Sequence, residues 1–241
     1  MSTTICFDFG NTRFKAAVFQ EDQLQEIIVL VDDDHDTIKE LMLRFQPAHT
    51  ILSSVVHHQS AVEDVLKEHS HFHKLSHHTK LPFTTPVGKP ETIGADRLAL
   101  CAAATYLFPK CNNLAIALGT CITYNFINVK NEFLGGSISP GLQMRLHSMH
   151  ALTAKLPLVN VEWNFPLIGY DTKTNLLSGA AWGMAKEIDG IIDAYRDKFG
   201  NFNVLLTGGD TPHFAPLLKN QIFADPQLIF KGLYAISVYN R

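Results

Sequence analysis

The sequence predicts an α/β protein built from two related halves. Short apolar runs with the length of strands alternate with stripes of apolar residues at helical spacing along the 241 residues. A strand, a glycine turn and a second strand occur around Gly10, and the same pattern returns around Gly119. Because internal repetition points to a repeated structural unit, we expect one half over residues 1–112 and the other over 113–241.

The first half begins with three expected strands, over residues 4–10, 13–20 and 24–31. The polar link at 21–23 is short, as in an antiparallel meander. The remaining elements follow from apolar spacing and from a proline suited to a first helical turn: a helix over 38–45, a strand over 50–56, a helix over 61–66, and a helix from Pro90 to about Leu107.

The second half repeats this opening. Apolar strands are expected over 114–118 and 122–129, with Gly119 and Thr120 between them. The later elements are a helix near 141–155, a helix over 176–197 and a strand with a glycine turn over 203–210. The helix over 176–197 is defined by apolar residues that step by four and three: Leu177, Ala181, Met184, Ile188, Ile191 and Tyr195.

Composition places the chain among ordinary globular proteins, with 46% hydrophobic and 18% charged residues. A net charge of −3 argues against a general nucleic-acid-binding face, and no segment has the roughly 20 apolar residues of a membrane helix. We therefore expect a cytoplasmic protein with no nucleic acid or membrane partner. The cysteines form no CxxC pair, so we expect reduced and mostly buried thiols at Cys6, Cys101, Cys111 and Cys121.

Asp8 is the first candidate functional residue, because it ends an apolar strand directly before the Gly10 turn. A carboxylate there is costly to bury without a partner, and glycine lets a ligand approach the backbone. With the Thr12 hydroxyl and the Lys15 charge, the turn could hold a nucleotide phosphate through Mg²⁺. The alternative is a simple hairpin turn in which Asp8 caps backbone amides.

Two further glycine turns favour the phosphate-binding alternative. Gly119-Thr120 could bind phosphate from the opposite side, and residues 207–210 (TGGD), with Gly208 and Gly209, could lie against the base or sugar. Three such turns in two repeated halves resemble the acetate and sugar kinase, Hsp70 and actin superfamily. That resemblance implies two ribonuclease H-like halves of the actin-like ATPase fold, each a mixed five-stranded sheet flanked by helices, with a nucleotide cleft between them.

Longer motifs make the resemblance more specific, and they span nearly the whole chain. They are DFGNT (8–12), PETIGADRLAL (90–100), LGTCIT (118–123), GGSISPGLQMRLHSMHALTAKLP (135–157), DTKTNLLSGAAWG (171–183) and TGGD (207–210). In this order and spacing the sequence resembles type III pantothenate kinase. The resemblance implies transfer of the ATP γ-phosphate to the primary hydroxyl of pantothenate, the first step of coenzyme A biosynthesis, by a homodimer with sites at its interface.

The resemblance also implies roles for individual residues. Asp96 would be the general base, and Asp8 would hold the Mg²⁺ of Mg–ATP. The implied ATP and phosphate positions are Asp8, Gly10, Asn11, Thr12, Lys15, Gly119, Thr120, Gly208 and Gly209. The implied pantothenate positions are Gly94, Ala95, Arg97 and Thr172. Taken without the motif, Asp96 and Arg97 would better suit an exposed ion pair on a helix, and the motif context reverses that preference.

Three positions depart from the family pattern. Ala117 stands where the family has an aspartate tied to a monovalent cation, so a K⁺ or NH₄⁺ requirement is expected to be weakened or altered. Val87 replaces a tyrosine against pantothenate, and Asn125 stands where related sequences often have aspartate. These changes keep open an alternative function, a slow or non-catalytic nucleotide-binding relative with a regulatory role.

A histidine-rich segment over residues 57–78 belongs to none of these motifs, although it holds seven of the 12 histidines. On a strand, His69, His71 and His73 would share one face and could bind Zn²⁺ or Ni²⁺. The alternative, which we favour, is a solvated helix end and loop.

Overall fold

The computed structural model describes residues 2–32, 34–86 and 88–241, so the expectation for Val87 lies outside the described residues. The chain divides into two compact units. Unit 1 contains Met1–Lys110, Lys130–Leu134 and Gln227–Arg241. Unit 2 contains Cys111–Val129 and Gly135–Pro226. Because compact units and sequence repeats are different partitions, the repeat boundary between residues 112 and 113 stays a prediction.

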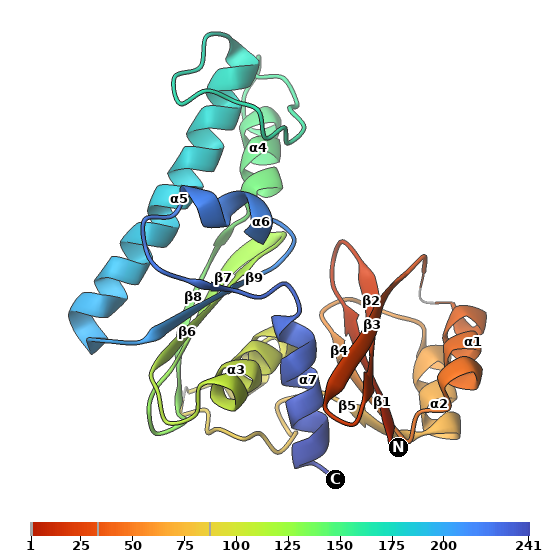
Figure 1. The fold of residues 1–241 in the computed structure, drawn as a ribbon. Helices are drawn as coiled ribbons and strands as arrows, with labels where there is room; N and C mark the ends of the chain where they lie inside the picture. The colour runs from red at the N-terminus through yellow and green to blue at the C-terminus, as the bar shows by residue number, and fades with distance from the viewer. Residues whose placement is uncertain (1, 33, 87) are drawn as a thin grey trace. The chain divides into compact units, whose positions relative to one another are not determined.

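The first sheet has the strand order β3-β2-β1-β4-β5 (Figure 1). Its strands are β1 (Thr3–Phe9), β2 (Phe14–Gln20), β3 (Gln23–Leu30), β4 (His49–Ser54) and β5 (His71–Lys74). The central strand β1 pairs antiparallel with β2 and parallel with β4. The register places Asp8 opposite Lys15 of β2 and beside Ser53 of β4, which fixes the immediate neighbours of the Asp8 carboxylate.

The second sheet repeats this order strand for strand, as β8-β7-β6-β9-β10. Its strands are β6 (Asn113–Leu118), β7 (Cys121–Ile127), β8 (Phe133–Pro140), β9 (Asn203–Thr207) and β10 (Phe223–Ala224). The central strand β6 pairs antiparallel with β7 and parallel with β9, exactly as β1 pairs with β2 and β4. The predicted fold class, two mixed five-stranded sheets with flanking helices, is therefore confirmed.

Most expected helices form, with shifted ends. The helices are α1 (His35–Phe45), α2 (Ser60–His69), α3 (Ala95–Leu107), α4 (Leu142–Ala151), α5 (Thr172–Phe199), α6 (Thr211–Phe214) and α7 (Leu228–Tyr239), with 3-10 turns η1 (Pro90–Thr92) and η2 (Ala215–Leu217). Pro90 starts the separate turn η1, and α3 begins only after its N-cap Gly94. No helix in the described ranges is both long and apolar enough to cross a bilayer.

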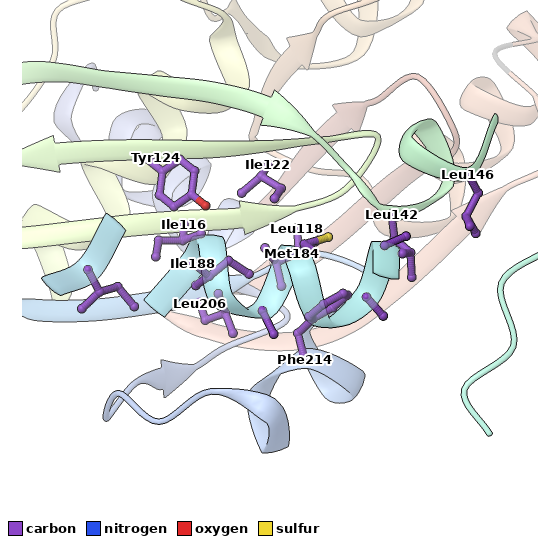
Figure 2. Packing of buried hydrophobic residues seen from close by; sticks show 14 of the residues in the cluster. Ile116, Leu118, Ile122, Tyr124, Leu142, Leu146, Met184, Ile188, Leu206 and Phe214 are labelled. Carbon is purple, nitrogen blue, oxygen red and sulfur yellow. The ribbon is translucent and has the colours of Figure 1, made fainter. Parts of the chain in front are cut away.

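Unit 2 is organised around α5, the longest helix (Figures 1 and 2). Its first turn is fixed by a capping box, in which the Asp171 carboxylate accepts from the Thr174 amide and the Thr174 hydroxyl accepts from the Asp171 amide. The predicted stripe is confirmed, since Met184 and Ile188 are fully buried against Ile116 of β6 and its neighbours. This packing holds β6 and the turn that follows it.

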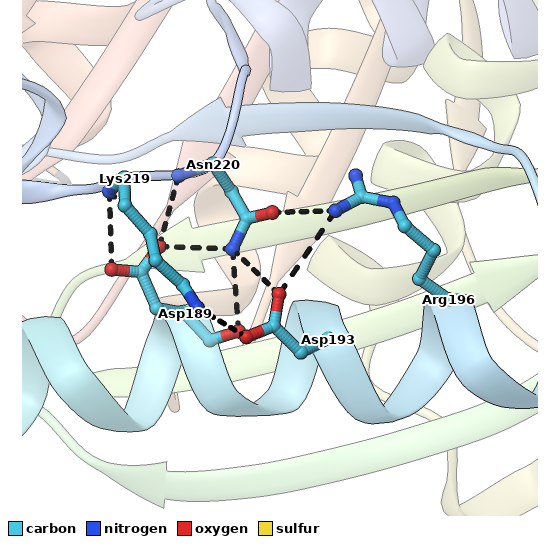
Figure 3. Close-up of polar contacts among 5 residues, drawn as sticks. All are labelled: Asp189, Asp193, Arg196, Lys219 and Asn220. Carbon is cyan, nitrogen blue, oxygen red and sulfur yellow. Dashed lines mark hydrogen bonds and ion pairs between the residues drawn. The ribbon is translucent and has the colours of Figure 1, made fainter.

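A buried aspartate ties the segment after η2 to α5 (Figure 3). The Asp189 carboxylate, 2% exposed, accepts hydrogen bonds from the backbone amides of Lys219 and Asn220 and from the Asn220 side chain, at 3.1 to 3.2 Å. The Asn220 side-chain oxygen also accepts from Arg196. These bonds satisfy a carboxylate that would otherwise be costly to bury, and they fix the path of the chain between α6 and β10.

The two faces of the first sheet have different roles. Residues at alternate positions of β1, including Phe7 and Phe9, pack in a core with α1 and α2. Because side chains alternate along a strand, Cys6 and Asp8 lie on the opposite face. Helix α7 packs against α3 and contacts β1 and β4, and α3 contacts β4. Asp8 thus lies on the face that carries α3, whose first turn holds Asp96.

Candidate functional site

Asp8 lies near the end of β1 in unit 1 and is partly buried. Burial raises the pKa of this carboxyl group to about 7, the nearby Asp96 carboxylate raises the pKa further, and the Lys15 ammonium opposes both effects. The carboxylate therefore has one cation close by but remains poorly compensated. Such a group suits a ligand that brings positive charge.

Asp96 occupies the first turn of α3, two residues after the N-cap Gly94. Burial raises the pKa of its carboxyl group, while the Arg97 backbone amide and guanidinium charge lower it. The helix N-terminus favours the carboxylate form as well. The Arg97 guanidinium lies 5.5 Å from the centre of the Phe133 ring, which supports its planar group from one side. Unit 1 thus brings together two carboxylates, Asp8 and Asp96, with a cation beside each.

The Gly10 turn connects β1 to β2 next to these carboxylates. The Gly10 amide donates to the Arg13 carbonyl at 3.1 Å, which closes the loop. Asn11 and Thr12 at its tip are exposed, and Ala95 lies in the first turn of α3. The predicted positions Asp8, Gly10, Asn11, Thr12, Lys15, Gly94, Ala95, Asp96 and Arg97 all belong to unit 1.

In unit 2 the equivalent turn follows β6. The Gly119 amide donates to the Cys121 carbonyl at 3.1 Å, and both Gly119 and Thr120 are exposed. Gly208 follows β9 with φ of 103°, and a Cβ there would overlap the Leu118 carbonyl oxygen. Only glycine fits this position without strain. The turn at 208–209 therefore lies against the end of β6, directly before the 119–120 turn.

The segment before α4 packs against the 119–120 turn. The Gly141 amide donates to the Thr120 carbonyl at 3.1 Å, and a Cβ on Gly141 would overlap the Gly119 carbonyl oxygen. Gly141 ends the segment GGSISPG, which was recognised as a motif without a role for this glycine. Its signal was the Pro-Gly pair directly before a helix. Gly141 is thus a part of the turn cluster that sequence reasoning did not single out.

Thr172 lies in a different part of unit 2 from these turns. It is the first residue of α5 and lines a pocket of about 560 Å³ between α4 and α5. Other lining residues include Arg145, Met149, Asn175 and Leu176. Arg145 contacts the Glu187 carboxylate and donates to the Pro140 carbonyl at 2.8 Å. The pocket has the size and mixed lining of a small-molecule site.

A model of the type III pantothenate kinase family matches residues 4–194. The chain belongs to that family. A type III pantothenate kinase from Cytophaga hutchinsonii is 41% identical over 238 residues, covering 98% of this chain and 99% of the relative. A type III pantothenate kinase from Flavobacterium johnsoniae is 40% identical over 230 residues, covering 94% and 93%.

Solved structures support the fold. A structure titled a conserved putative Baf family transcriptional activator from Campylobacter jejuni matches with a TM-score of 0.62 at 21% identity, covering 98% of both chains. A glucokinase from an Antarctic psychrotroph matches with a TM-score of 0.55 at 9% identity, covering 99% of both. At these identities the likeness concerns the fold alone, the two-sheet α/β architecture of sugar kinases.

As a type III pantothenate kinase family member, the chain is a kinase enzyme, and a kinase of this fold uses a nucleotide with a divalent metal ion.

The position of the family aspartate, Ala117, has polar neighbours in unit 2. Ala117 in β6 lies opposite Thr123 of β7 and beside Thr207 of β9. The Asn125 amide, fully buried, donates to the Thr123 hydroxyl and to the Ala115 carbonyl at 3.2 Å each. This kinase therefore has hydroxyl and amide groups, but no carboxylate, at the position where the family pattern has one.

The histidine-rich segment does not form a metal site among the described residues. His69 ends α2, while His71 and His73 lie on β5, so the three do not share one strand. The His73 Nε2 atom lies 2.9 Å from the Thr79 hydroxyl, and burial lowers the pKa of this imidazole. The favoured alternative, a helix end and loop, describes this segment except for the short strand β5.

Only two of the four cysteines are buried, whereas most were expected to be. Cys6 and Cys101 are buried, and burial raises the pKa of both thiols. Cys111 is exposed and Cys121 is intermediate. The thiols in the described ranges form no disulfide and belong to no metal-ligand group.

Proposed function

We propose that this chain catalyses ATP-dependent phosphorylation of pantothenate to 4'-phosphopantothenate, the first step of coenzyme A biosynthesis. The observation that carries the proposal is the pair of partly buried carboxylates, Asp8 and Asp96, on the α3 face of the first sheet in a type III pantothenate kinase family member. A phosphotransferase needs one carboxylate for the metal–nucleotide and another near the acceptor hydroxyl.

Asp96 is the proposed general base. The pantothenate hydroxyl oxygen forms a bond to the γ-phosphorus as the bond between that phosphorus and the β,γ-bridging oxygen breaks, and ADP leaves. The hydroxyl proton passes to the Asp96 carboxylate. Burial raises the pKa of Asp96, which makes the carboxylate a better proton acceptor than an exposed aspartate.

Asp8 is the proposed ligand for the divalent ion of Mg–ATP. The donor set fits Mg²⁺, because Asp8 supplies a hard carboxylate oxygen that is partly buried and poorly compensated. When bound, the ion would neutralise negative charge on the nucleotide phosphates. The proposed phosphate contacts are the glycine turns with their backbone amides and small side chains, together with one ammonium group: Gly10, Asn11, Thr12, Lys15, Gly119, Thr120, Gly208 and Gly209.

Four residues are proposed for pantothenate. Gly94 and Ala95 allow close approach to the start of α3, and Arg97 can bind the pantothenate carboxylate through two N–H groups. Thr172 contributes a hydroxyl from the pocket between α4 and α5. That pocket combines apolar lining with hydroxyl and amide groups, which suits the dimethyl and amide parts of pantothenate.

The residues around Ala117 do not fit the family's monovalent-cation site as the family pattern describes it. A K⁺ or NH₄⁺ ion would find the Thr123 and Thr207 neighbours but no carboxylate charge. We therefore propose no step that depends on such an ion.

We propose a homodimer that works in the cytoplasm. The segment between α4 and α5 carries strongly exposed apolar side chains, including Leu152 and Ile168 at 83% and Tyr170 at 82%. It leads directly into Thr172, so a second copy covering this surface would lie next to a proposed pantothenate residue. Light scattering at working concentration should give twice the chain mass, and Ile168→Asp should shift the protein toward monomer.

The proposed activity is tested by following ADP release with Mg–ATP and pantothenate, with the product identified by mass. We expect release that depends on pantothenate and a product heavier by one phosphoryl group, and no comparable release with glucose. Folded protein that binds ADP but releases none from ATP with pantothenate would instead favour the non-catalytic relative.

A further inference from the structure

Ser53 near the end of β4 has a hydroxyl group without a hydrogen-bonding partner. The residue is 0% exposed, and its Oγ atom contacts no donor or acceptor within hydrogen-bond distance among the described residues. An unpaired buried hydroxyl destabilises the folded state, and most buried polar groups in folded proteins are paired. An alanine at this position would avoid that cost. The presence of a serine therefore suggests a hydrogen-bonding partner from outside the polypeptide.

The strand register locates this hydroxyl next to the proposed metal ligand. Ser53 and Asp8 are direct neighbours on the parallel strands β4 and β1, and paired residues of neighbouring strands point to the same face. Lys15 is the neighbour of Asp8 on the other side. The Asp8 side chain therefore lies between an ammonium group and an unpaired hydroxyl, on the face that carries α3.

The adjacent residue Ser54 provides an internal contrast. It points to the opposite face, and its hydroxyl donates to the Val56 carbonyl at 2.9 Å and lies 3.0 Å from the His58 Nδ1 atom. Ser54 is thus satisfied by the fold itself, whereas Ser53 is not. Two serines side by side in one strand therefore differ in whether their hydroxyl groups have partners.

We propose that Ser53 is a positioning residue of the Mg–ATP site, with its hydroxyl reserved for the hydrated divalent ion beside Asp8. This inference rests on the proposed function, specifically on Asp8 as the metal ligand. Mg²⁺ gives up its water ligands reluctantly and usually keeps several of them in proteins. A serine hydroxyl can accept a hydrogen bond from one of these waters while Asp8 supplies the charge, which holds the ion in one position.

The test compares Ser53→Ala with Ser54→Ala by calorimetric titration of ADP, with and without Mg²⁺, and by thermal unfolding of the ligand-free protein. For Ser53→Ala we expect ADP binding in Mg²⁺ to weaken about tenfold, the value of one hydrogen bond to a charged group. Binding without Mg²⁺ should be unchanged, and the unfolding temperature unchanged or higher. Ser54→Ala should lower the unfolding temperature and leave both affinities unchanged.

Two results would overturn the proposal. The first is that Ser53→Ala binds ADP in the presence of Mg²⁺ as tightly as the unaltered protein does. The other is an equal loss of affinity with and without Mg²⁺ together with a lower unfolding temperature, which would mean a structural role. Asp8→Asn in the same titrations distinguishes failure of the Ser53 proposal from failure of the proposed function. If it removes the Mg²⁺ effect while Ser53→Ala does not, only the Ser53 proposal fails; if neither removes it, the metal assignment of Asp8 fails too.

Discussion

The two central strands of the molecule, β1 and β6, occupy the same place in their sheets and end in equivalent turns, but they carry different chemistry. Asp8 precedes Gly10 by two residues, and Ala117 precedes Gly119 by two residues. On the neighbouring strands, Asp8 has Lys15 and Ser53, whereas Ala117 has two threonines. The first turn therefore follows a partly buried carboxyl group, and the second follows a methyl group with hydroxyl groups around it.

This difference separates what the repeat provides from what the site requires. The repeated topology produces a glycine turn at the end of each central strand, with exposed residues at its tip. It does not specify the side chain two residues earlier. The carboxylate at that position lies in the first sheet only, next to the helix that carries Asp96, and it is held there at a cost in stability.

Replacing Asp8 should lower activity more than any other change considered, and it should raise the stability of the folded state. We expect Asp8→Asn to lower turnover at least about a thousandfold, because the divalent ion loses its charged ligand. Burial raises the pKa of Asp8 to about 7, from 3.8 when exposed, so the folded state holds this proton more tightly than the unfolded state. The protonated Asp8 carboxyl group therefore contributes its full stabilisation of the folded state below about pH 4. This contribution is lost as the pH rises to about 7.

The stability part of this prediction is measured by urea unfolding at pH 4 and at pH 8. At pH 8 Asp8→Asn should be more stable than the unaltered chain by up to about 4 kcal/mol, which is the value of three pKa units. The gain should disappear at pH 4. An equal change at both pH values would contradict a raised pKa for Asp8.

In the second sheet, we expect substitutions in the turn at 208–209 to act through steric overlap. Gly208→Ala places a Cβ where the Leu118 carbonyl oxygen lies, at a positive φ, so we expect a loss of about 2–4 kcal/mol in unfolding free energy and weaker ADP binding. Gly209→Ala is the matched control for the unfolding free energy, because a Cβ there meets nothing within 4 Å. If both variants lose the same unfolding free energy, the close approach of Gly208 to β6 is wrong.

The smallest expected effect concerns Ala117. The unaltered protein should change its turnover by no more than about threefold between K⁺-free and K⁺-containing buffer, since the position has no carboxylate to attract the ion. Ala117→Asp should create a K⁺ dependence, because its charge would join the neighbouring hydroxyl groups of Thr123 and Thr207. A steep K⁺ response in the unaltered chain would show that other groups replace the family aspartate.

The repeat and the turns were predictable because their signals are local. Alternating and stepped apolar residues marked the central strands and α5, and the glycines marked the turns. Helix α7 was not predicted, because its nearly continuous apolar sequence lacks a helical stripe. It is buried against α3 and the first sheet, so its pattern reflects contacts with residues more than a hundred positions away.

The site was predictable only in part for the same reason. Asp8 and Asp96 were found through sequence motifs, but the effect of Asp96 on the pKa of Asp8 depends on the packing of α3 against the sheet. Ser53 gave no motif of its own, and its importance appears only when strand register places it beside Asp8. Gly141 likewise gains its meaning from a contact with the Thr120 carbonyl.

The most direct measurement of the central claim is single-turnover phosphoryl transfer to pantothenate by Asp96→Asn, with Glu91→Gln, exposed in η1, as the control. The asparagine keeps the shape but cannot accept the proton, so we predict a rate lower by about 10²–10⁴-fold with ADP affinity within about threefold of the unaltered protein. Glu91→Gln should match the unaltered rate. A rate for Asp96→Asn close to that of the unaltered enzyme would contradict Asp96 as the general base of this kinase.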